Sequence, residues 1–199
     1  VEAVHRIPLF AALALSLLYS LPPVRMCARP FLDMLANAVG YGGVAFVLGF
    51  TVFDPSVNRA LWPAAPYVLL VAATFLHTTI LDFEGDRESG KKSTSVLIGI
   101  GASAHLAALF HAAAFAVAAF QLSPAAMIIT GVTLPLSVYA VARGSKRTSS
   151  LLIQANTLVV TAAAAAAWPL YLAVALPLVL LSRFYHRRRF GITYPGKTS

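Results

Sequence analysis

The sequence predicts an all-α, polytopic membrane protein, a helical bundle with about seven transmembrane helices. Hydrophobic residues make up 59% of the 199 residues and charged residues only 11%, whereas soluble domains carry about 25% charged residues. Apolar runs long enough to cross a bilayer recur along the chain. These runs are continuous and rich in Ala and Leu, without the alternation of β-barrel strands. The sequence therefore indicates membrane-spanning helices.

Each predicted helix corresponds to one apolar run or to part of one. Five runs of suitable length lie near residues 4–21, 34–50, 62–81, 96–120 and 125–142. A further run, 151–183, is too long for one crossing, and Trp168-Pro169 near its middle divides it in two because proline interrupts helical hydrogen bonding. Residues 1–199 are expected to form one transmembrane helical domain.

Positive charge is concentrated in every second connection between these helices. The basic connections are residues 22–33, 82–95 and 143–150 and the tail from Arg183, whereas the intervening ones contribute only Arg59. The positive-inside rule places the basic loops and the C-terminus in the cytoplasm. The net charge of +8 is spread between apolar runs, so membrane lipid rather than nucleic acid is the expected partner.

Four of the seven acidic residues lie between residues 82 and 88. Asp82 and Asp86, four residues apart, are expected to share one helix face at the end of a span, with Glu84 and Glu88 pointing away. Two carboxylates at a membrane boundary suit Mg²⁺, which completes its coordination with waters and phosphate oxygens. Nearby cations suited to phosphate are Arg87, Lys91 and Lys92. The alternative is a solvated loop whose acidic and basic side chains pair with one another.

A second chemically distinctive segment follows the first predicted helix. Its sequence is Tyr19-Ser-Leu-Pro-Pro-Val-Arg25-Met-Cys-Ala-Arg29-Pro30. The two consecutive prolines end the helix and stiffen the turn, which holds Tyr19 at membrane depth and the arginines near the polar boundary. The ring of Tyr19 is suited to stabilising a cation, although tyrosine at this depth is also a common interfacial anchor.

Together the two segments resemble the UbiA-type intramembrane prenyltransferase superfamily. The resemblance rests on Tyr-Ser-x-Pro-Pro-x-Arg followed, two spans later, by Asp-x-Glu-Gly-Asp-x-x-x-Gly-Lys-x-Thr. It implies Mg²⁺-dependent transfer of a polyprenyl group from a prenyl diphosphate to an acceptor that the motifs do not identify. By the same resemblance, the metal ligands would be Asp82 and Asp86, the diphosphate contacts Arg25, Arg29 and Lys91, and the residues near the reacting carbon Tyr19 and Ser20.

The chain departs from this superfamily in two places. The first aspartate motif of the family, Asn-Asp-x-x-Asp-x-x-x-Asp, is absent, and Asp33 and Asn37 lie in the wrong loop and at the wrong spacing to replace it. We therefore expect the chain to be the C-terminal two-thirds of a larger prenyltransferase and to be inactive by itself. Cys27 stands where many members have lysine, which weakens the phosphate-binding character of that turn.

Other classes of membrane protein fit the sequence less well. A transporter or channel subunit with a cytoplasmic acidic gate predicts ionisable groups at the membrane midplane, whereas these carboxylates gather at a boundary. A CDP-alcohol phosphotransferase would need Asp-Gly-x-x-Ala-Arg, which the chain lacks, and a catalytically inactive membrane partner remains a further alternative. Three histidines lie within the spans without metal-ligand spacing, and we expect packing or pocket roles for His77, His105 and His111.

Overall fold

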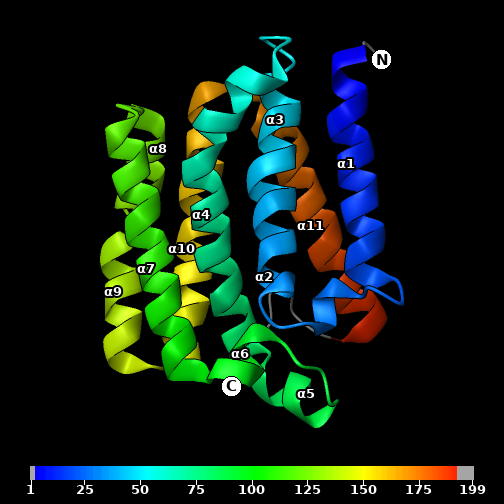
Figure 1. The fold of residues 1–199 in the computed structure, drawn as a ribbon, viewed down its shortest axis with the longest axis vertical. Helices are drawn as coiled ribbons and strands as arrows, with labels where there is room; N and C mark the ends of the chain where they lie inside the picture. Colours follow the sequence, from blue (N-terminus) through cyan, green and yellow to red (C-terminus); the bar gives the residue numbers. More distant parts are fainter. Residues whose placement is uncertain (1–2, 192–199) are drawn as a thin grey trace. The chain divides into compact units, whose positions relative to one another are not determined.

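The computed structural model describes residues 3–191, and the ordered elements in that range are all helical. The predicted all-α fold class is confirmed. The chain divides at Asn156 into two compact units, and each is described by itself. The helices of Figure 1 are α1 (Ala3–Ser20), η1 (Met26–Ala28), α2 (Leu32–Asn37), η2 (Ala38–Val44), α3 (Ala45–Phe50), α4 (Val57–Leu81), α5 (Phe83–Glu88), α6 (Thr94–Ile98), α7 (Ile100–Phe120), α8 (Pro124–Gly131), α9 (Leu134–Arg143), α10 (Lys146–Ala167) and α11 (Leu170–Phe190).

Five helical segments in the described range are long and apolar enough to cross a membrane. They are Leu32–Phe50, Val57–Leu81, Ile100–Phe120, Pro124–Arg143 and Lys146–Ala167, and His5–Ser20 forms a shorter apolar helix. Within the second unit, α10 ends at Ala167 and α11 begins at Leu170. The helix break that Pro169 predicts is therefore present, and α11 carries its basic residues in its last turns.

Two helices begin at different residues from those that the apolar runs suggest. The run expected over 96–120 is divided because Gly99 adopts φ +84°, a conformation open mainly to glycine, so α6 ends there and α7 begins at Ile100. In contrast, α4 starts earlier than expected, because the hydroxyl of Ser56 accepts a hydrogen bond of 3.4 Å from the backbone N–H of Arg59 and caps the helix.

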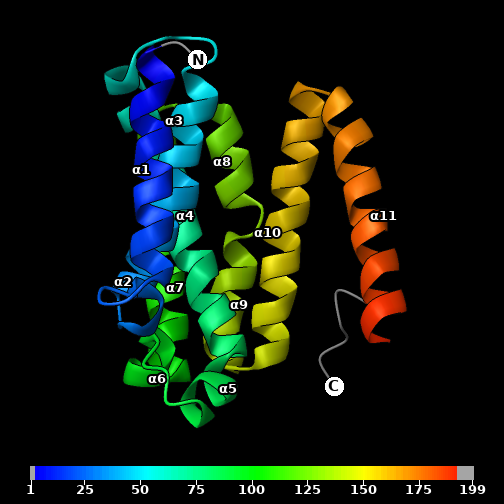
Figure 2. The same cartoon turned by 90° about the vertical axis from the view of Figure 1, so that its right-hand side faces the viewer.

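The basic connections of the first unit gather at one end of it. Figures 1 and 2 both place η1, α5, α6 and the turn from α9 to α10 at the same end. These segments carry or adjoin Arg25, Arg29, Arg87, Lys91, Lys92, Arg143, Lys146 and Arg147. We call this the basic end of the unit. It brings together the two motif segments that the sequence singled out.

A π-helix, η2, packs closely against α4 near the middle of the unit. A Cβ atom added at Gly42 would lie 2.5 Å from Val68 Cα and 2.7 Å from the carbonyl oxygen of Tyr67. One turn further along the chain, in α3, the ring of Phe46 stacks on that of Tyr67 in α4, with ring centroids 5.0 Å apart. Small residues allow this kind of close backbone approach between membrane helices. Gly42 therefore fixes the distance between η2 and α4.

We predict that Gly42→Ala destabilises the protein by about 1–3 kcal/mol, because the new methyl group overlaps backbone atoms that cannot move aside. Thermal unfolding in detergent measures the effect. Gly49→Ala is the matched control, since no atom lies within 4 Å of a Cβ at that position, and it should be neutral or slightly stabilising. Equal unfolding midpoints for both variants would contradict the packing described here.

Candidate functional site

The turn after α1 holds two side-chain-bearing residues in left-handed conformations. Arg25 has φ +42° and Phe31 has φ +63°, values that residues other than glycine seldom adopt. Arg29 stabilises the turn between them, because its Nη2 donates a hydrogen bond of 2.8 Å to the carbonyl oxygen of Pro23. Such backbone strain persists only where the surrounding structure holds it.

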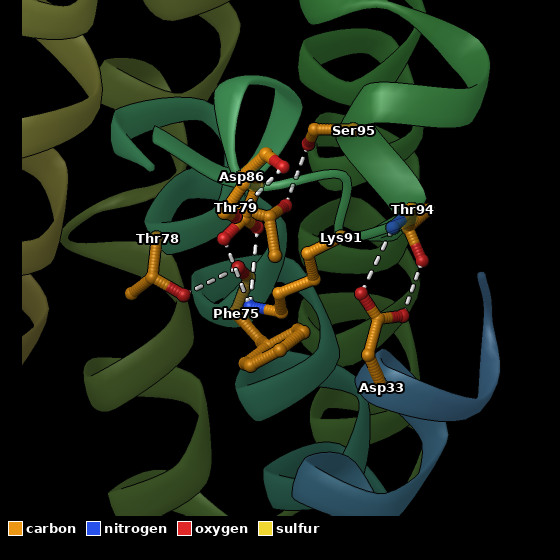
Figure 3. A network of polar contacts seen from close by, with 9 residues as sticks. Asp33, Phe75, Thr78, Thr79, Asp86, Lys91, Thr94 and Ser95 are labelled. Atoms are coloured by element: carbon orange, nitrogen blue, oxygen red, sulfur yellow. Dashed lines mark hydrogen bonds and ion pairs between the residues drawn. The ribbon is translucent and has the colours of Figure 1, made fainter. Parts of the chain in front are cut away.

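The surrounding structure that holds this turn is a cluster of hydrogen bonds around Asp33. This carboxylate is only 1% exposed. Its Oδ2 accepts 2.8 Å from the backbone N–H of Thr94, and its Oδ1 accepts from the Thr94 hydroxyl and, at 2.8 Å, from the N–H of Met34. The N–H of Phe31 in turn donates 2.7 Å to Thr94 Oγ1. Figure 3 shows Asp33 and Thr94 facing one another, and we call these bonds the Asp33–Thr94 latch.

The aspartates of the acidic segment follow one another within a single helical turn. Asp82 ends α4, and its carbonyl oxygen accepts 2.8 Å from the N–H of Asp86 in α5. Asp82 is exposed and Asp86 is 8% exposed. Partial loss of solvation and the charge of Asp86 raise the pKa of Asp82, while Lys91 and Lys146 oppose this rise. The two carboxylates therefore lie close enough to repel one another.

Lys91 lies where the acidic segment meets the turn after α1. Its Nζ lies 3.0 and 3.2 Å from the two carboxylate oxygens of Asp86 (Figure 3). Burial lowers the pKa of Lys91, but the hydrogen bond and charge of Asp86, with smaller contributions from Tyr19 and Asp82, outweigh burial and raise it. The ammonium group of Lys91 thus forms an ion pair with one of the two predicted aspartates, Asp86.

The other two acidic residues of the segment, like Asp82, are exposed. Glu84 is exposed and pairs with Lys146 at the start of α10, and the hydrogen bond from Lys146 lowers the pKa of Glu84. Glu88 is also exposed. Acidic and basic side chains of this segment do pair, as the solvated-loop interpretation expects, but one of the two pairs involves the largely buried Asp86.

A second buried contact anchors the loop that carries Lys91. The hydroxyl oxygens of Thr79 in α4 and Ser95 in α6 lie 2.6 Å apart, and both side chains are buried. Figure 3 shows this contact close to the Asp86–Lys91 ion pair. The loop is therefore held to α4 by Thr79 and to α2 by the latch.

Tyr19 and Ser20 line a groove between α1 and the continuous rod of α2, η2 and α3. The groove has a volume of about 380 Å³. Its polar lining consists of Ser16, Tyr19, Ser20, Asn37 and Tyr41, and the other lining residues are apolar. Tyr19 and Ser20 lie in the last turn of α1, so this end of the groove adjoins the turn that carries Arg25 and Arg29.

The predicted phosphate-binding arginines are less closely engaged with the acidic segment. Arg25 is exposed, and the guanidinium group of Arg29 is bonded to the turn itself. Asn37, which the sequence excluded as a replacement for a missing motif, donates 2.8 Å to the carbonyl oxygen of Asp33 and lines the groove. The structure thus engages Lys91 with the acidic segment, through Asp86, more closely than either arginine.

The carboxylates of Asp82 and Asp86 suit a cation whose other ligands are water and phosphate oxygens. Within residues 3–191, no group of three or more His, Cys, Asp or Glu side chains is placed to hold a metal ion. Asp82 and Asp86 alone offer the one or two carboxylates that Mg²⁺ commonly takes when water and phosphate oxygens complete its coordination. The repulsion between these two carboxylates is the kind that a bound cation relieves.

Sequence reasoning overlooked the residues that hold the site together. Asp33 was considered only as a replacement for a missing motif, and Thr79, Ser95 and Lys146 were not singled out. Burying a carboxylate at the start of an apolar span costs free energy unless the carboxylate has hydrogen-bond partners. This cost is the sequence signal from which a structural role for Asp33 could have been predicted. The identity of its partner, 61 residues away, has no local signal.

The long apolar helices define the class, a helical membrane protein. Sequence comparison identifies the family within that class. The chain belongs to the UbiA prenyltransferase family, whose model matches residues 7–150. A lycopene elongase/hydratase of Corynebacterium glutamicum is 28% identical over 139 residues, which cover 69% of this chain and 47% of that protein. A lycopene elongase/hydratase of Haloarcula japonica is 32% identical over 96 residues, which cover 47% of this chain and 31% of that protein.

The matched region spans about half the length, or less, of these curated relatives. No solved structure gives a significant match to the chain.

We predict that Thr94→Val destabilises the protein by about 1–3 kcal/mol, because Asp33 loses a donor and the Phe31 N–H loses its acceptor inside the protein. Thr94→Ser keeps the hydroxyl and should stay close to the wild type. Chemical denaturation in detergent compares the two variants. If valine and serine gave the same stability, the latch would contribute nothing beyond packing.

Proposed function

We propose that this chain carries the diphosphate-binding part of a membrane prenyltransferase that moves a polyprenyl group to a lipophilic acceptor. Membership of the UbiA family supports a prenyltransferase-type function in the membrane. One observation carries the assignment to these residues: the Asp33–Thr94 latch holds the turn that follows Tyr19 and the mainly apolar groove to the loop in which Lys91 pairs with Asp86. Such an arrangement suits a ligand with an apolar tail and a charged head.

The charged head would lie at the basic end of the first unit. In this proposal Lys91, whose side chain is 35% exposed, turns from Asp86 towards a phosphate oxygen. Asp82 and Asp86 would then hold Mg²⁺, which when bound neutralises charge on the diphosphate leaving group. Arg25 and Arg29 lie in the adjoining turn and would add positive charge around the same head group.

The apolar tail would lie in the groove between α1 and the rod of α2, η2 and α3. Transfer begins when the bond between the allylic carbon and the diphosphate oxygen breaks and its electron pair leaves with the diphosphate. The π electrons of the acceptor then form the new carbon–carbon bond, and the acceptor releases a proton. The ring of Tyr19 can stabilise the positive carbon, and the mainly apolar lining limits its capture by water.

The acceptor we propose is a polyene of the carotenoid type. The support is the name of the relatives, lycopene elongase/hydratase, shared by proteins from two organisms. An electron-rich terminal double bond would supply the π electrons that the reaction needs. We further propose that the basic end faces the cytoplasm, as the positive-inside rule indicates, and that turnover also requires a first aspartate motif, which the sequence lacks.

We predict that Asp82→Asn and Asp86→Asn each weaken Mg²⁺-dependent binding of geranylgeranyl diphosphate by about tenfold or more, because each removes a charged oxygen ligand. Isothermal titration of the detergent-solubilised chain, with Mg²⁺ and with EDTA, measures the affinity. Binding to the wild type should be lost in EDTA.

The matched control for this experiment is Glu88→Gln, which removes one negative charge from an exposed position of the same segment. Its affinity should remain within about twofold of the wild type. Wild-type affinity in either aspartate variant, or binding that is indifferent to EDTA, would overturn the metal assignment.

A further inference from the structure

A second polar cluster lies inside the first unit, away from the acidic segment. It links four helical segments through Thr74 of α4, His111 of α7, Thr133 before α9 and Asn156 of α10. Asn156 Nδ2 donates 2.9 Å to Thr74 Oγ1, and Thr133 Oγ1 donates 2.5 Å to Asn156 Oδ1. Polar groups buried in an apolar core are normally all hydrogen-bonded, so any atom of this cluster that lacks a bond is informative.

The bonding of His111 fixes which of its ring nitrogens carries the proton. Nε2 lies 2.9 Å from the carbonyl oxygen of Thr130, and a carbonyl can only accept, so Nε2–H is the donor. Thr133 Oγ1, 3.2 Å from the same nitrogen, has given its own hydrogen to Asn156 and accepts here as well. In the neutral ring the lone pair is therefore on Nδ1.

That lone pair lacks a partner, and so does a nitrogen of a second buried imidazole. His111 and His77 are both 0% exposed. His77 Nδ1 lies 3.0 Å from the hydroxyl of Ser149. Among the described residues, however, neither His77 Nε2 nor His111 Nδ1 has a hydrogen-bond partner. The two rings lie on α4 and α7, which pack against one another.

A third buried atom in the same part of the chain is also unsatisfied. Ser137 lies four residues after Thr133, so the two share one face of α9. Ser137 is 0% exposed, and its Oγ has no partner within the described part of the chain. Three of the buried polar atoms without partners thus come from α4, α7 and α9, and α7 packs against both of the other helices.

We propose that an ordered water molecule bridges His77 Nε2 and His111 Nδ1 in the core of the first unit, with Ser137 Oγ as a third partner. Buried waters typically make about three hydrogen bonds to polar groups that otherwise lack them. The water donates one hydrogen bond to the lone pair on His111 Nδ1. Its other hydrogen bonds are with His77 Nε2 and Ser137 Oγ. This inference is independent of the proposed reaction.

Water suits these atoms better than a metal ion does. Within residues 3–191, no third His, Cys, Asp or Glu side chain joins the two imidazoles. A cation would therefore lack charged ligands in an apolar interior, which is unfavourable. A neutral molecule that both donates and accepts satisfies all three atoms without introducing charge.

The test is NMR spectroscopy of the detergent-solubilised chain labelled with ¹⁵N-histidine. We expect the unprotonated nitrogen of His111 to show the chemical shift of a hydrogen-bonded acceptor, and both buried rings to show magnetisation transfer from water. His77→Leu removes one partner and should weaken the water contact of His111. His105→Leu is the matched control on α7, because His105 is exposed and, within residues 3–191, hydrogen-bonds to Gly101 of its own helix alone, and it should leave that contact unchanged.

A chemical shift typical of an unbonded lone pair, without transfer from water, would overturn the proposal. So would stoichiometric metal in the purified protein by elemental analysis. If His77→Leu failed to fold, the wild-type spectrum would still decide the question. Ser137→Ala then provides a milder variant, which leaves both rings in place and should reduce the transfer from water to His111.

Discussion

The arrangement of the basic end depends on the hydrogen bonds between Asp33 and Thr94. They join two segments 61 residues apart in the sequence, the strained turn after α1 and the loop that carries Lys91. A buried carboxylate is expensive unless it is fully hydrogen-bonded, and Asp33 accepts from two backbone N–H groups and a hydroxyl. Moving either segment would remove both bonds from Thr94 and leave only the N–H of Met34, so the two segments are fixed relative to one another.

The same constraint determines where the side chains proposed to contact the substrate lie. Lys91 lies three residues before Thr94, and Asp86 in turn accepts both bonds from Lys91. Tyr19 ends the helix on the other side of the latched turn and lines the groove. In this UbiA-family chain, one buried carboxylate thus holds the turn that follows the groove to the loop that carries Lys91. Asp33 and Thr94 act by positioning other residues, and neither lies among the groups proposed to contact the substrate.

Much of this organisation is predictable from the sequence, because it depends on local rules. The lengths of the apolar runs predicted where the long helices lie, and Pro169 predicted the break between α10 and α11. The alternation of charge between connections predicted that the basic connections lie at the same end. The position of Asp86 one helical turn after Asp82 followed from their spacing of four residues. The latch, the π-helix around Gly42 and the break at Gly99 were not predicted, since each depends on a neighbour distant in sequence or on a backbone conformation without a distinctive pattern. Histidines expected to pack inside the spans do so at His77 and His111, whereas His105 is exposed.

Hydrogen–deuterium exchange at the amide of Thr94 tests the central claim most directly, because this N–H donates to Asp33 Oδ2. In Asp33→Asn, which keeps the size of the side chain and removes its charge, we expect faster exchange at Thr94 and, together with it, in the turn of residues 21–31. The helical amides of α7 should keep their protection. Unchanged exchange at Thr94, or faster exchange confined to residues next to position 33, would contradict the claim that this carboxylate holds the two segments together.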